Sequence, residues 1–431
     1  RRHGINFNSD SSMANEAWGR TYPMLMRNAG YYVGYIGKNH TPAGKNEEGV
    51  IGYGSGVMDH SFDYWYAGHK HLGFYPKENK RHTIFANAKA NTQIEIMEEG
   101  VENFFTSNRA FQEGYNFLDS RPEDKPFALL LNFNVPHGAG TRSMKLREGD
   151  LPLYRTAYRD RVEEIKLPST YVAEKDMVTP KIPRSVYSGE YIEQYHYVKT
   201  PEDMIERTIR TMQTITGIDK LLGKLLEKLE EQGIADNTII IFTSDHGLLH
   251  GEHGLGGKVL LYEPSIRIPL IVYDPRVNIA VTRKELVALL DIAPTLLELA
   301  GLPVPREVQG KSLKPLIQGI DAKWRDVLFF ENNMTIQHYP RMESVRTQRW
   351  KYIRYFDKDQ KYEDMLLASI NGEEPIYEEL FDLRNDPVEY HNMVYDLSSK
   401  AILDQLRAKN KKLVKQLRGY DPLSTYIHNK K

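Results

Sequence analysis

The chain has 431 residues, of which 40% are hydrophobic, 11% aromatic and 27% charged, a mixture typical of folded globular domains. Its 57 Lys and Arg residues nearly balance its 58 Asp and Glu residues, for a formal net charge of −1, which excludes a globally basic nucleic-acid binder. These residues include no Cys, so they contain no disulfide, thiolate metal site or cysteine nucleophile. No run approaches 18 consecutive apolar residues, so no transmembrane helix is predicted.

Short apolar segments predict the strands of a central sheet. A Tyr/Val/Ile segment follows Gly30, and three further runs occupy residues 127–133 (FALLLNF), 238–243 (TIIIFT) and 268–273. Nearly continuous apolar runs of this length are typical of buried strands that helices cover on both faces. Strands of this kind, alternating with helices, predict an α/β sandwich.

Two segments between and after these runs predict helices. Apolar residues recur at three- and four-residue steps over residues 205–229, and this pattern ends near Gly233, where a helix would stop. A second helix is predicted from Asp291, a plausible N-cap, with Pro294 tolerated in the first turn and Gly301 at the end.

The pattern changes after about Trp324. Residues 326–331, 344–356 and 380–383 are typical of short antiparallel strands. A last amphipathic helix is then marked by Leu403, Leu406, Leu413 and Leu417. We therefore place a boundary near Lys323, with a larger unit at 1–323 and a smaller α+β subdomain with an antiparallel sheet at 324–431.

The first motif with chemical potential follows the first strand. Gly37 permits a tight turn, and Lys38 and His40 lie two residues apart, so in extended chain their side chains project to the same side. A Lys can neutralise an anion, and a nearby His can donate or shuttle a proton. Taken alone, the pattern favours a strand end with solvated Lys and His side chains.

A stronger motif follows the strand at 238–243. Ser244, Asp245, His246 and Gly247 come at its carboxyl end, which is where α/β enzymes keep their sites. A carboxylate beside an imidazole is a plausible half of a divalent-metal site. The alternative is an ordinary strand-to-loop turn, in which Asp and Gly are common.

Further polar residues cluster around these positions. His250, Glu252 and His253 follow closely, but their spacing is not that of an HExxH zinc site. A Gly-rich turn then presents Lys258 in the manner of an anion cradle, without the spacing of a Walker A motif. His137 follows Pro136 after the strand at 127–133 and is a candidate proton donor, although a lone His in such a place is more often structural.

Taken together and in this order, the motifs resemble the sulfatase family of the alkaline-phosphatase-like superfamily, and bacterial polysaccharide sulfatases in particular. Residues 30–40 are similar to the family's second signature, and residues 244–258 (SDHGLLHGEHGLGGK) to its later metal and lysine segment. The resemblance runs from residue 1 to about residue 396 and is supported by the segments 262–270, 291–301, 345–352 and 379–389.

The resemblance implies a fold and a mechanism. The fold is an alkaline-phosphatase-like sandwich with a mostly parallel central sheet flanked by helices. Family members hydrolyse sulfate esters with a formylglycine nucleophile and one bound Ca²⁺, which neutralise charge as the S–O bond breaks. By position, Asp245 and His246 correspond to two metal ligands, and Lys38, His40, His137 and Lys258 correspond to groups that contact the sulfate, the nucleophile or the leaving group.

The resemblance also implies features that these residues lack. Formylglycine is made from the Cys or Ser of a C/S-x-P-S-R motif, and neither that motif nor the first pair of Asp ligands is present. The chain opens with RRHG, and its first predicted strand begins only near Tyr31. We therefore expect an N-terminally truncated sulfatase sequence whose isolated 431 residues have negligible activity.

The substrate class is predicted to be a sulfated glycan. The 27 Tyr and 4 Trp residues include clusters at 62–66 and 187–197, and aromatic faces stack on the apolar faces of sugars. His60, His69 and His71 could line a substrate subsite; a solvated loop is the alternative for each of them. The family resemblance implies export to a periplasm or cell surface.

Two other functions stay open from the sequence. One is a phosphodiesterase or phosphonate monoester hydrolase of the same superfamily, which the identity of the nucleophile and the number of metal ions would distinguish. The other is a non-catalytic remnant that only binds anionic glycan. Binding without turnover, even in the complete gene product, would favour the second alternative.

Overall fold

The computed structural model describes residues 11–69, 75–80, 83–85, 88–96, 117–137, 148, 150–178, 182–183, 195–332, 339–356, 373–418 and 426–428. Among these residues, no helix is both long and apolar enough to span a lipid bilayer.

A three-stranded parallel sheet forms the centre of the larger part of the chain. Its order is β3 (Tyr64–His69), β2 (Tyr32–Asn39) and β4 (Phe127–Asn132), with both pairs parallel. The register places Gly37 opposite Asn132 on one side, and Lys38 opposite Gly68 on the other. Because all three strands run the same way, their carboxyl ends meet at one edge, which carries the candidate site.

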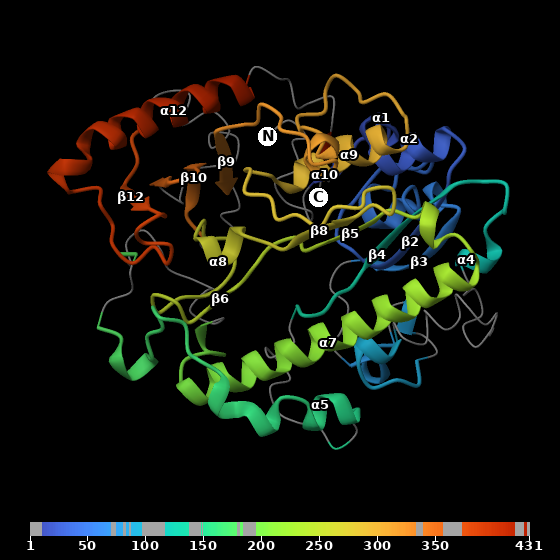
Figure 1. Ribbon diagram of the computed structural model, residues 1–431, viewed down its shortest axis with the longest axis horizontal. Coiled ribbons are helices and arrows are strands. Elements are labelled where there is room, and N and C mark those ends of the chain that lie inside the picture. The colour runs from blue at the N-terminus through green and yellow to red at the C-terminus, as the bar shows by residue number, and fades with distance from the viewer. Residues whose placement is uncertain are drawn as a thin grey trace.

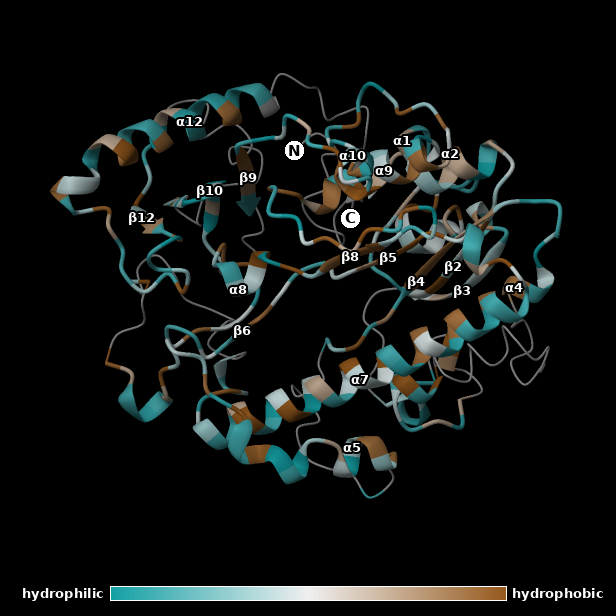
Figure 2. Ribbon diagram, in the orientation of Figure 1, coloured by the Kyte–Doolittle hydropathy of each residue, from teal (hydrophilic) through white to brown (hydrophobic). Residues whose placement is uncertain are grey.

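Helices cover both faces of this sheet, as the apolar strands predict. On one face, Ile36, Leu129 and Leu131 pack with Leu221 and Leu229 of the long helix α7 (Pro201–Glu231). Figure 1 shows α7 running along this face, and in Figure 2 it alternates between hydrophobic and hydrophilic residues, as an amphipathic helix does.

The opposite face packs against three shorter helices. These are α1 (Asn15–Gly19), α2 (Tyr22–Asn28) and α9 (Ile292–Leu299). Trp18, Met26 and Leu297 from these helices pack with Val33 and Tyr35 of β2, on the side away from α7 (Figure 1). Each large apolar side chain buried here contributes about 1.5–3 kcal/mol relative to exposure.

The strands at 238–243 and 268–273 differ in part from expectation. They form β5 (Ile240–Thr243) and β8 (Leu270–Tyr273), which pair antiparallel with Thr243 opposite Leu270. Ile271 is 61% and Tyr273 51% exposed, while Leu270 and Val272 are more buried. Alternate positions of β8 therefore face solvent, whereas its continuous apolar run predicted burial on both faces.

The helix at 291–301 forms with a different N-terminal arrangement from the one predicted. Asp291 ends a short 3₁₀ turn and its side chain does not cap α9. Instead its fully buried carboxylate accepts hydrogen bonds from the amide of Ala288 (2.9 Å), the amide of Lys311 (2.8 Å) and Nη2 of Arg325 (2.6 Å). The predicted N-cap is therefore a buried anion that ties three segments together.

The C-terminal part has the predicted antiparallel sheet. Its order is β12 (Tyr377–Asp382), β11 (Trp350–Phe356), β10 (Arg341–Thr347) and β9 (Val327–Asn332). Leu403 and Leu406 of α12 (Lys400–Arg418) are buried against this sheet, and α12 lies along it in Figure 1. The α/β fold class with a second, antiparallel sheet is thus confirmed, and the boundary near Lys323 stays a prediction.

The remaining short elements connect these parts. They are β1 (Ser11–Met13), which pairs antiparallel with β13 (Tyr426–His428), then α4 (Phe117–Ser120), α5 (Pro152–Thr156), the hairpin of β6 (Leu249–His250) and β7 (Gly256–Gly257), α8 (Glu263–Ile266) and α10 (Lys314–Ile317).

Candidate active site

Lys38 lies near the end of β2 and is held there by neighbouring strand residues. Gly37 has φ of +99°, so a glycine accommodates the backbone just before Lys38. The hydroxyl of Tyr35 donates to the carbonyl of Lys38 (2.8 Å), and Nδ2 of Asn132 on β4 donates to the Tyr35 hydroxyl (2.5 Å). This chain of hydrogen bonds fixes the backbone from which the half-buried Lys38 side chain projects.

The turn after β5 presents Asp245 and His246. The amide of His246 donates to Oδ1 of Asp245 (2.9 Å), and the hydroxyl of Ser244 donates to the carbonyl of His246 (3.0 Å). The Asp245 side chain is 77% exposed, and its Oδ2 lies 3.5 Å from Nε2 of His246. The carboxylate and the imidazole therefore face the same space outside the strand end.

A glycine is required at position 247 because the backbone of α8 lies very close to it, and not because of its own backbone conformation. Its φ is not among the positive values, but a Cβ at this position would lie 2.0 Å from the carbonyl oxygen of Pro264. Its amide donates to the carbonyl of Ser265 at 2.8 Å. Only a residue without a side chain allows this close approach between the turn and α8.

Lys258 directly follows β7 of the β6–β7 hairpin, and its side chain reaches His246. Nζ of Lys258 lies 3.3 Å from Nε2 of His246, and Nδ1 of His246 lies 2.8 Å from the carbonyl oxygen of Gly247. A carbonyl can only accept, so Nδ1 carries the proton and Nε2 presents its lone pair to the Lys258 ammonium. The same lone pair is the one that a metal ion would use.

Electrostatic coupling shows that these groups converge. The pKa of Lys38 is lowered by burial and then by the charge of Lys258, while the Asp245 carboxylate opposes the shift. The pKa of His246 is also lowered, by burial first and then by the charge of Lys258, so the ring is neutral near pH 7. The structure thus brings together Lys38, Lys258, Asp245 and His246 from three separate segments.

Two of the other predicted residues lie near the same edge of the sheet. The amide of His137 donates to the carbonyl of Asn134 (3.0 Å) in the turn beyond β4. His40 directly follows β2, and its ring stacks on Tyr53 with centroids 6.5 Å apart. Their roles in catalysis stay predictions.

The predicted substrate residues have different placements. His69 ends β3 and lies opposite Asn39 in the register, beside the end of β2. His60 is exposed in a 3₁₀ turn, where its ring lies near Gly56. His71 falls outside the described residues, so the predicted subsite is not described as a whole.

The His and Glu side chains of the β6–β7 hairpin make contacts inside the protein. Burial, with a contribution from the charge of Arg207, lowers the pKa of His250 to about 3, so its ring is neutral. Glu252 accepts a hydrogen bond from the amide of His250, and His253 packs its ring against Tyr262, with centroids 5.4 Å apart. This arrangement agrees with the absence of an HExxH pattern.

Asp245 and His246 fit part of a metal site. An exposed carboxylate and an imidazole whose Nε2 carries a lone pair are suitable donors for a divalent ion. Ca²⁺ takes six to eight oxygen ligands, and the residues that the structure describes contain no group of three or more His, Asp or Glu placed to hold a metal. These two residues would therefore supply only a fraction of the coordination.

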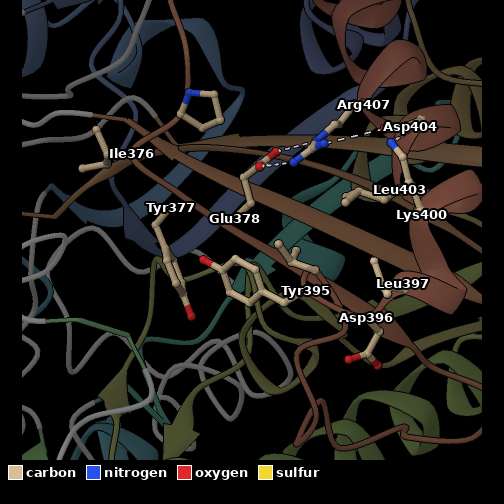
Figure 3. Close-up of a pocket in the computed structure, with 12 residues that line it drawn as sticks. Ile376, Tyr377, Glu378, Tyr395, Asp396, Leu397, Lys400, Leu403, Asp404 and Arg407 are labelled. Carbon is tan, nitrogen blue, oxygen red and sulfur yellow. Dashed lines mark hydrogen bonds and ion pairs between the residues drawn. The ribbon is translucent and has the colours of Figure 1, made fainter.

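A separate pocket of about 400 Å³ lies in the C-terminal part of the chain, between β12 and α12. Figure 3 shows Tyr377 and Tyr395 on one side and the paired Glu378 and Arg407 on the other, with Nε of Arg407 donating to Oε1 of Glu378 (2.9 Å). None of the predicted site residues lines this pocket, so it is distinct from the site at the strand ends.

Sequence reasoning missed the residues that support the site. Tyr35 and Asn132 hold Lys38 in place, and the carbonyl of Ser265 holds Gly247. Asn132 gave a signal, as a polar residue at the end of an otherwise apolar strand. A backbone carbonyl such as that of Ser265 gives no signal in the sequence.

Comparison with known proteins identifies the family of the chain. The model of the family described as Sulfatase matches residues 20–302, and the model described as N-sulphoglucosamine sulphohydrolase, C-terminal, matches residues 251–416. An arylsulfatase of Clostridium perfringens is 28% identical over 96% of this chain and 80% of its own length. An N-acetylglucosamine-6-O-sulfatase of Bacteroides thetaiotaomicron is 26% identical over 87% of this chain and 68% of its own length.

Solved structures show the same fold. A protein crystallised in complex with its substrate D-glucosamine-2-N,6-O-disulfate superposes with a TM-score of 0.61 at 21% identity, over 97% of this chain and 86% of that one. The first family model covers more than half of the chain. The chain therefore belongs to the sulfatase family and has the alkaline-phosphatase-like fold.

Proposed function

We propose that the chain is the catalytic part of a sulfuric ester hydrolase that removes sulfate from a sulfated glycan. The observation that carries the proposal is the convergence of Lys38 and Lys258 beside Asp245 and His246 at the carboxyl edge of the sheet. Two ammonium groups held close together are a preorganised site for an anion.

The charges of the two lysines explain why an anion would bind. In the free protein the pKa of Lys38 is lowered first by burial and then by the charge of Lys258. A sulfate ester placed between Lys38 and Lys258 would replace this repulsion with two charge-assisted hydrogen bonds, each worth about 1.5–3 kcal/mol. As the S–O bond breaks and charge grows on the leaving oxygen, the same groups stabilise the transition state more than the ground state.

His137 and His40 are proposed to have separate roles in the reaction. The leaving alkoxide needs a proton at its oxygen, and His137, in the turn beyond β4, is the candidate donor. His40 follows Lys38 by two residues and is proposed to contact the sulfate or the nucleophile. Asp245 Oδ2 and His246 Nε2 are proposed as two ligands of one Ca²⁺, which when bound would polarise the sulfate oxygens.

The nucleophile is expected to be formylglycine, which these residues do not supply. The sequence contains neither Cys nor an S-x-P-S-R motif. We therefore expect the 431 residues on their own to release sulfate at a negligible rate. Rapid sulfate release by the purified chain would refute this part of the proposal.

The names of the relatives support a sulfated amino sugar as the substrate. One relative is an N-acetylglucosamine-6-O-sulfatase, and one structural neighbour was solved with D-glucosamine-2-N,6-O-disulfate. His60, His69 and His71 are proposed to contact the sugar. Action on such polymers fits a periplasmic or cell-surface location, which is part of the same proposal.

Binding to the purified chain tests the anion site without requiring turnover. Isothermal titration with glucosamine 6-sulfate should give measurable heat, and glucosamine should bind at least about tenfold more weakly, since it lacks the sulfate. Lys258→Met and Lys38→Met should each weaken binding by about 10- to 100-fold. Lys220→Met, at an exposed position of α7, is the matched control and should bind like the parent.

Two outcomes would contradict the proposal. Equal affinity for glucosamine and its 6-sulfate would show that no sulfate site exists. A phosphonate monoester that binds more tightly than the sulfate ester would instead favour the phosphodiesterase or phosphonate hydrolase alternative.

A further inference from the structure

Three motifs of the sequence meet in one buried network that the proposed chemistry does not use. The segments at 262–270, 345–352 and 379–389 resemble the family but contain none of the proposed catalytic residues. In the structure they meet where α8 lies beside the C-terminal sheet, and Figure 1 shows α8 between β10 and β8. This position connects the C-terminal sheet to the site.

Lys351 is the centre of the network. It is fully buried on β11, and its Nζ lies 2.7 Å from Oε1 of Glu389 and 3.2 Å from Oε1 of Glu263. Oε2 of Glu389 accepts the amide of Glu263 at 2.6 Å. Arg346 of β10 is the register partner of Lys351 on the neighbouring strand β11, and its Nη2 lies 3.4 Å from Oε2 of Glu263.

The charges in this network balance. Lys351 and Arg346 supply two positive charges, and Glu263 and Glu389 supply two negative ones. A buried group of ions is tolerated when it is neutral as a whole, and loss of one member leaves an uncompensated buried charge. The start of α8 at Glu263 is thereby held by its side chain and by its backbone amide.

The preceding residue is held as well. The hydroxyl of Tyr262, which is fully buried, donates to the carboxylate of Glu379 at 2.9 Å, and the hydroxyl of Tyr355 donates to Oε2 of the same carboxylate at 2.7 Å. Residues 262 and 263 are therefore anchored to strands β11 and β12 and to Glu389, all in the C-terminal part of the chain.

The anchored helix then touches the candidate site. α8 spans only four residues, Glu263–Ile266, so its first and third residues cannot move independently. The carbonyl of Ser265 accepts the amide of Gly247 at 2.8 Å, and the Pro264 carbonyl fills the space where a Cβ of Gly247 would lie. Gly247 directly follows Asp245 and His246 and supplies the carbonyl that orients the His246 ring.

We propose that Lys351 is a positioning residue for the candidate site. Through Glu263 and Glu389 it fixes α8, and α8 fixes the turn that presents Asp245 and His246. The C-terminal sheet thus sets the geometry of a site to which it contributes no reacting group. The proposal rests on the proposed function only in that this turn belongs to the active site.

Hydrogen exchange of the full 431-residue chain tests this without ligand or turnover. Lys351→Met should speed exchange at the Gly247 amide, read from overlapping peptides that cover residues 244–250, by at least about tenfold. The matched control is Arg354→Met, which breaks a buried ion pair with Glu343 (Nε to Oε2, 2.8 Å) on the opposite face of the same strand. It should lower global stability without changing exchange at Gly247 beyond that global loss.

A second pair of variants covers the case in which Lys351→Met does not fold. Glu389→Gln keeps an oxygen for the Glu263 amide and should speed Gly247 exchange less than Lys351→Met does. The double variant Lys351→Met/Glu389→Gln leaves an ion pair of Glu263 with Arg346 whose net charge is zero. It should therefore fold and be more stable than Lys351→Met. It should still exchange faster than the parent at Gly247, because both anchors are weakened.

The results separate positioning from stability alone. If Lys351→Met and Arg354→Met raise Gly247 exchange equally at equal loss of unfolding free energy, Lys351 is merely structural and the proposal is wrong. If the double variant folds with parental exchange at Gly247, the network does not hold the turn, and the proposal is equally wrong. Neither result depends on sulfate binding, so failure of the proposed function would be visible separately in the titrations.

Discussion

Lys38 and Lys258 are held near each other although their charges repel. The cost is visible at Lys38, whose pKa is lowered by burial and by the charge of Lys258. Two ammonium groups that lie close together make each other harder to protonate, and pKa values perturbed in this way cluster at functional sites. The proposed anion recognition depends on this pair of lysines.

The coupling between the two lysines predicts a measurable shift. Lys258→Met should raise the pKa of Lys38 toward its ordinary value, because it removes a nearby positive charge and leaves the burial of Lys38 in place. The readout is the NMR titration of the Lys38 Cε resonance. Lys220→Met should leave that titration unchanged, and an unchanged Lys38 pKa in Lys258→Met would show that the two ammonium groups do not interact.

Gly247 makes a second prediction at the level of one residue. Gly247→Ala should lower the free energy of unfolding by about 1–3 kcal/mol, because its Cβ would collide with the backbone oxygen of Pro264. Gly223→Ala is the matched control on α7, where a Cβ meets nothing within 4 Å, and it should stabilise the chain by about 0.4–1 kcal/mol. Urea unfolding of both variants checks the pair; a Gly247→Ala variant as stable as the parent would contradict the close approach.

At the level of elements, local patterns predicted the long helices and the apolar strands, but not β3 of the central sheet or the short helices α1 and α2. β2, β4 and α7 appear where apolar periodicity placed them, because these elements bury continuous apolar faces. The direction of β8 could not be predicted, since a short apolar run fits either pairing direction. The hydrogen-bond partners of Asp291 were equally hidden, because Lys311 and Arg325 lie 20 and 34 residues away.

The loss of unfolding free energy caused by one substitution distinguishes two possible roles of Asp291, a helix N-cap and a buried ion-pair partner. A helix N-cap replaced by Ala costs about 0.5–2 kcal/mol, whereas removal of one partner from a buried ion pair costs about 3–5 kcal/mol. Since Asp291 is fully buried and paired with Arg325, Asp291→Ala should show the larger loss in urea unfolding. Adding Arg325→Met should recover part of it; a loss near 1 kcal/mol would mean that Asp291 acts only as a cap.

At the scale of the whole molecule, the site combines distant segments. The order of motifs predicted one site for Lys38, His40, His137, Asp245, His246 and Lys258. The structure places Lys258 and Asp245 beside the His246 ring and within electrostatic reach of Lys38, and the inclusion of His40 and His137 stays a prediction. The network around Lys351 was not predicted, because its members are spread over more than 120 residues and their contacts depend on how the C-terminal sheet packs on α8. Sequence motifs indicated which residues matter there but not what they do.

Acid sensitivity of the C-terminal sheet follows from its ion pairs. Nε and Nη2 of Arg349 donate to the carboxylate of Asp382 at 2.9 and 2.6 Å, which holds the pKa of Asp382 below its usual range. Because the folded-state pKa is depressed, this stabilisation is complete above the ordinary Asp pKa of about 4 and is lost as the pH falls through the folded-state value.

Unfolding experiments at several pH values check this. The destabilisation caused by Asp382→Asn should be largest at neutral pH and should shrink as the pH is lowered below about 4. Arg349→Met should show the same trend, since it removes the other half of the pair. A loss of unfolding free energy that is the same at all pH values would show that the pair does not depress the pKa of Asp382.

The most direct test of the account is a crystal structure of the chain with glucosamine 6-sulfate bound. We predict that the sulfate group lies within hydrogen-bond distance of Nζ of both Lys38 and Lys258, beside Asp245 and His246. A sulfate bound elsewhere, for example in the pocket between β12 and α12, with the two lysines unchanged, would contradict it.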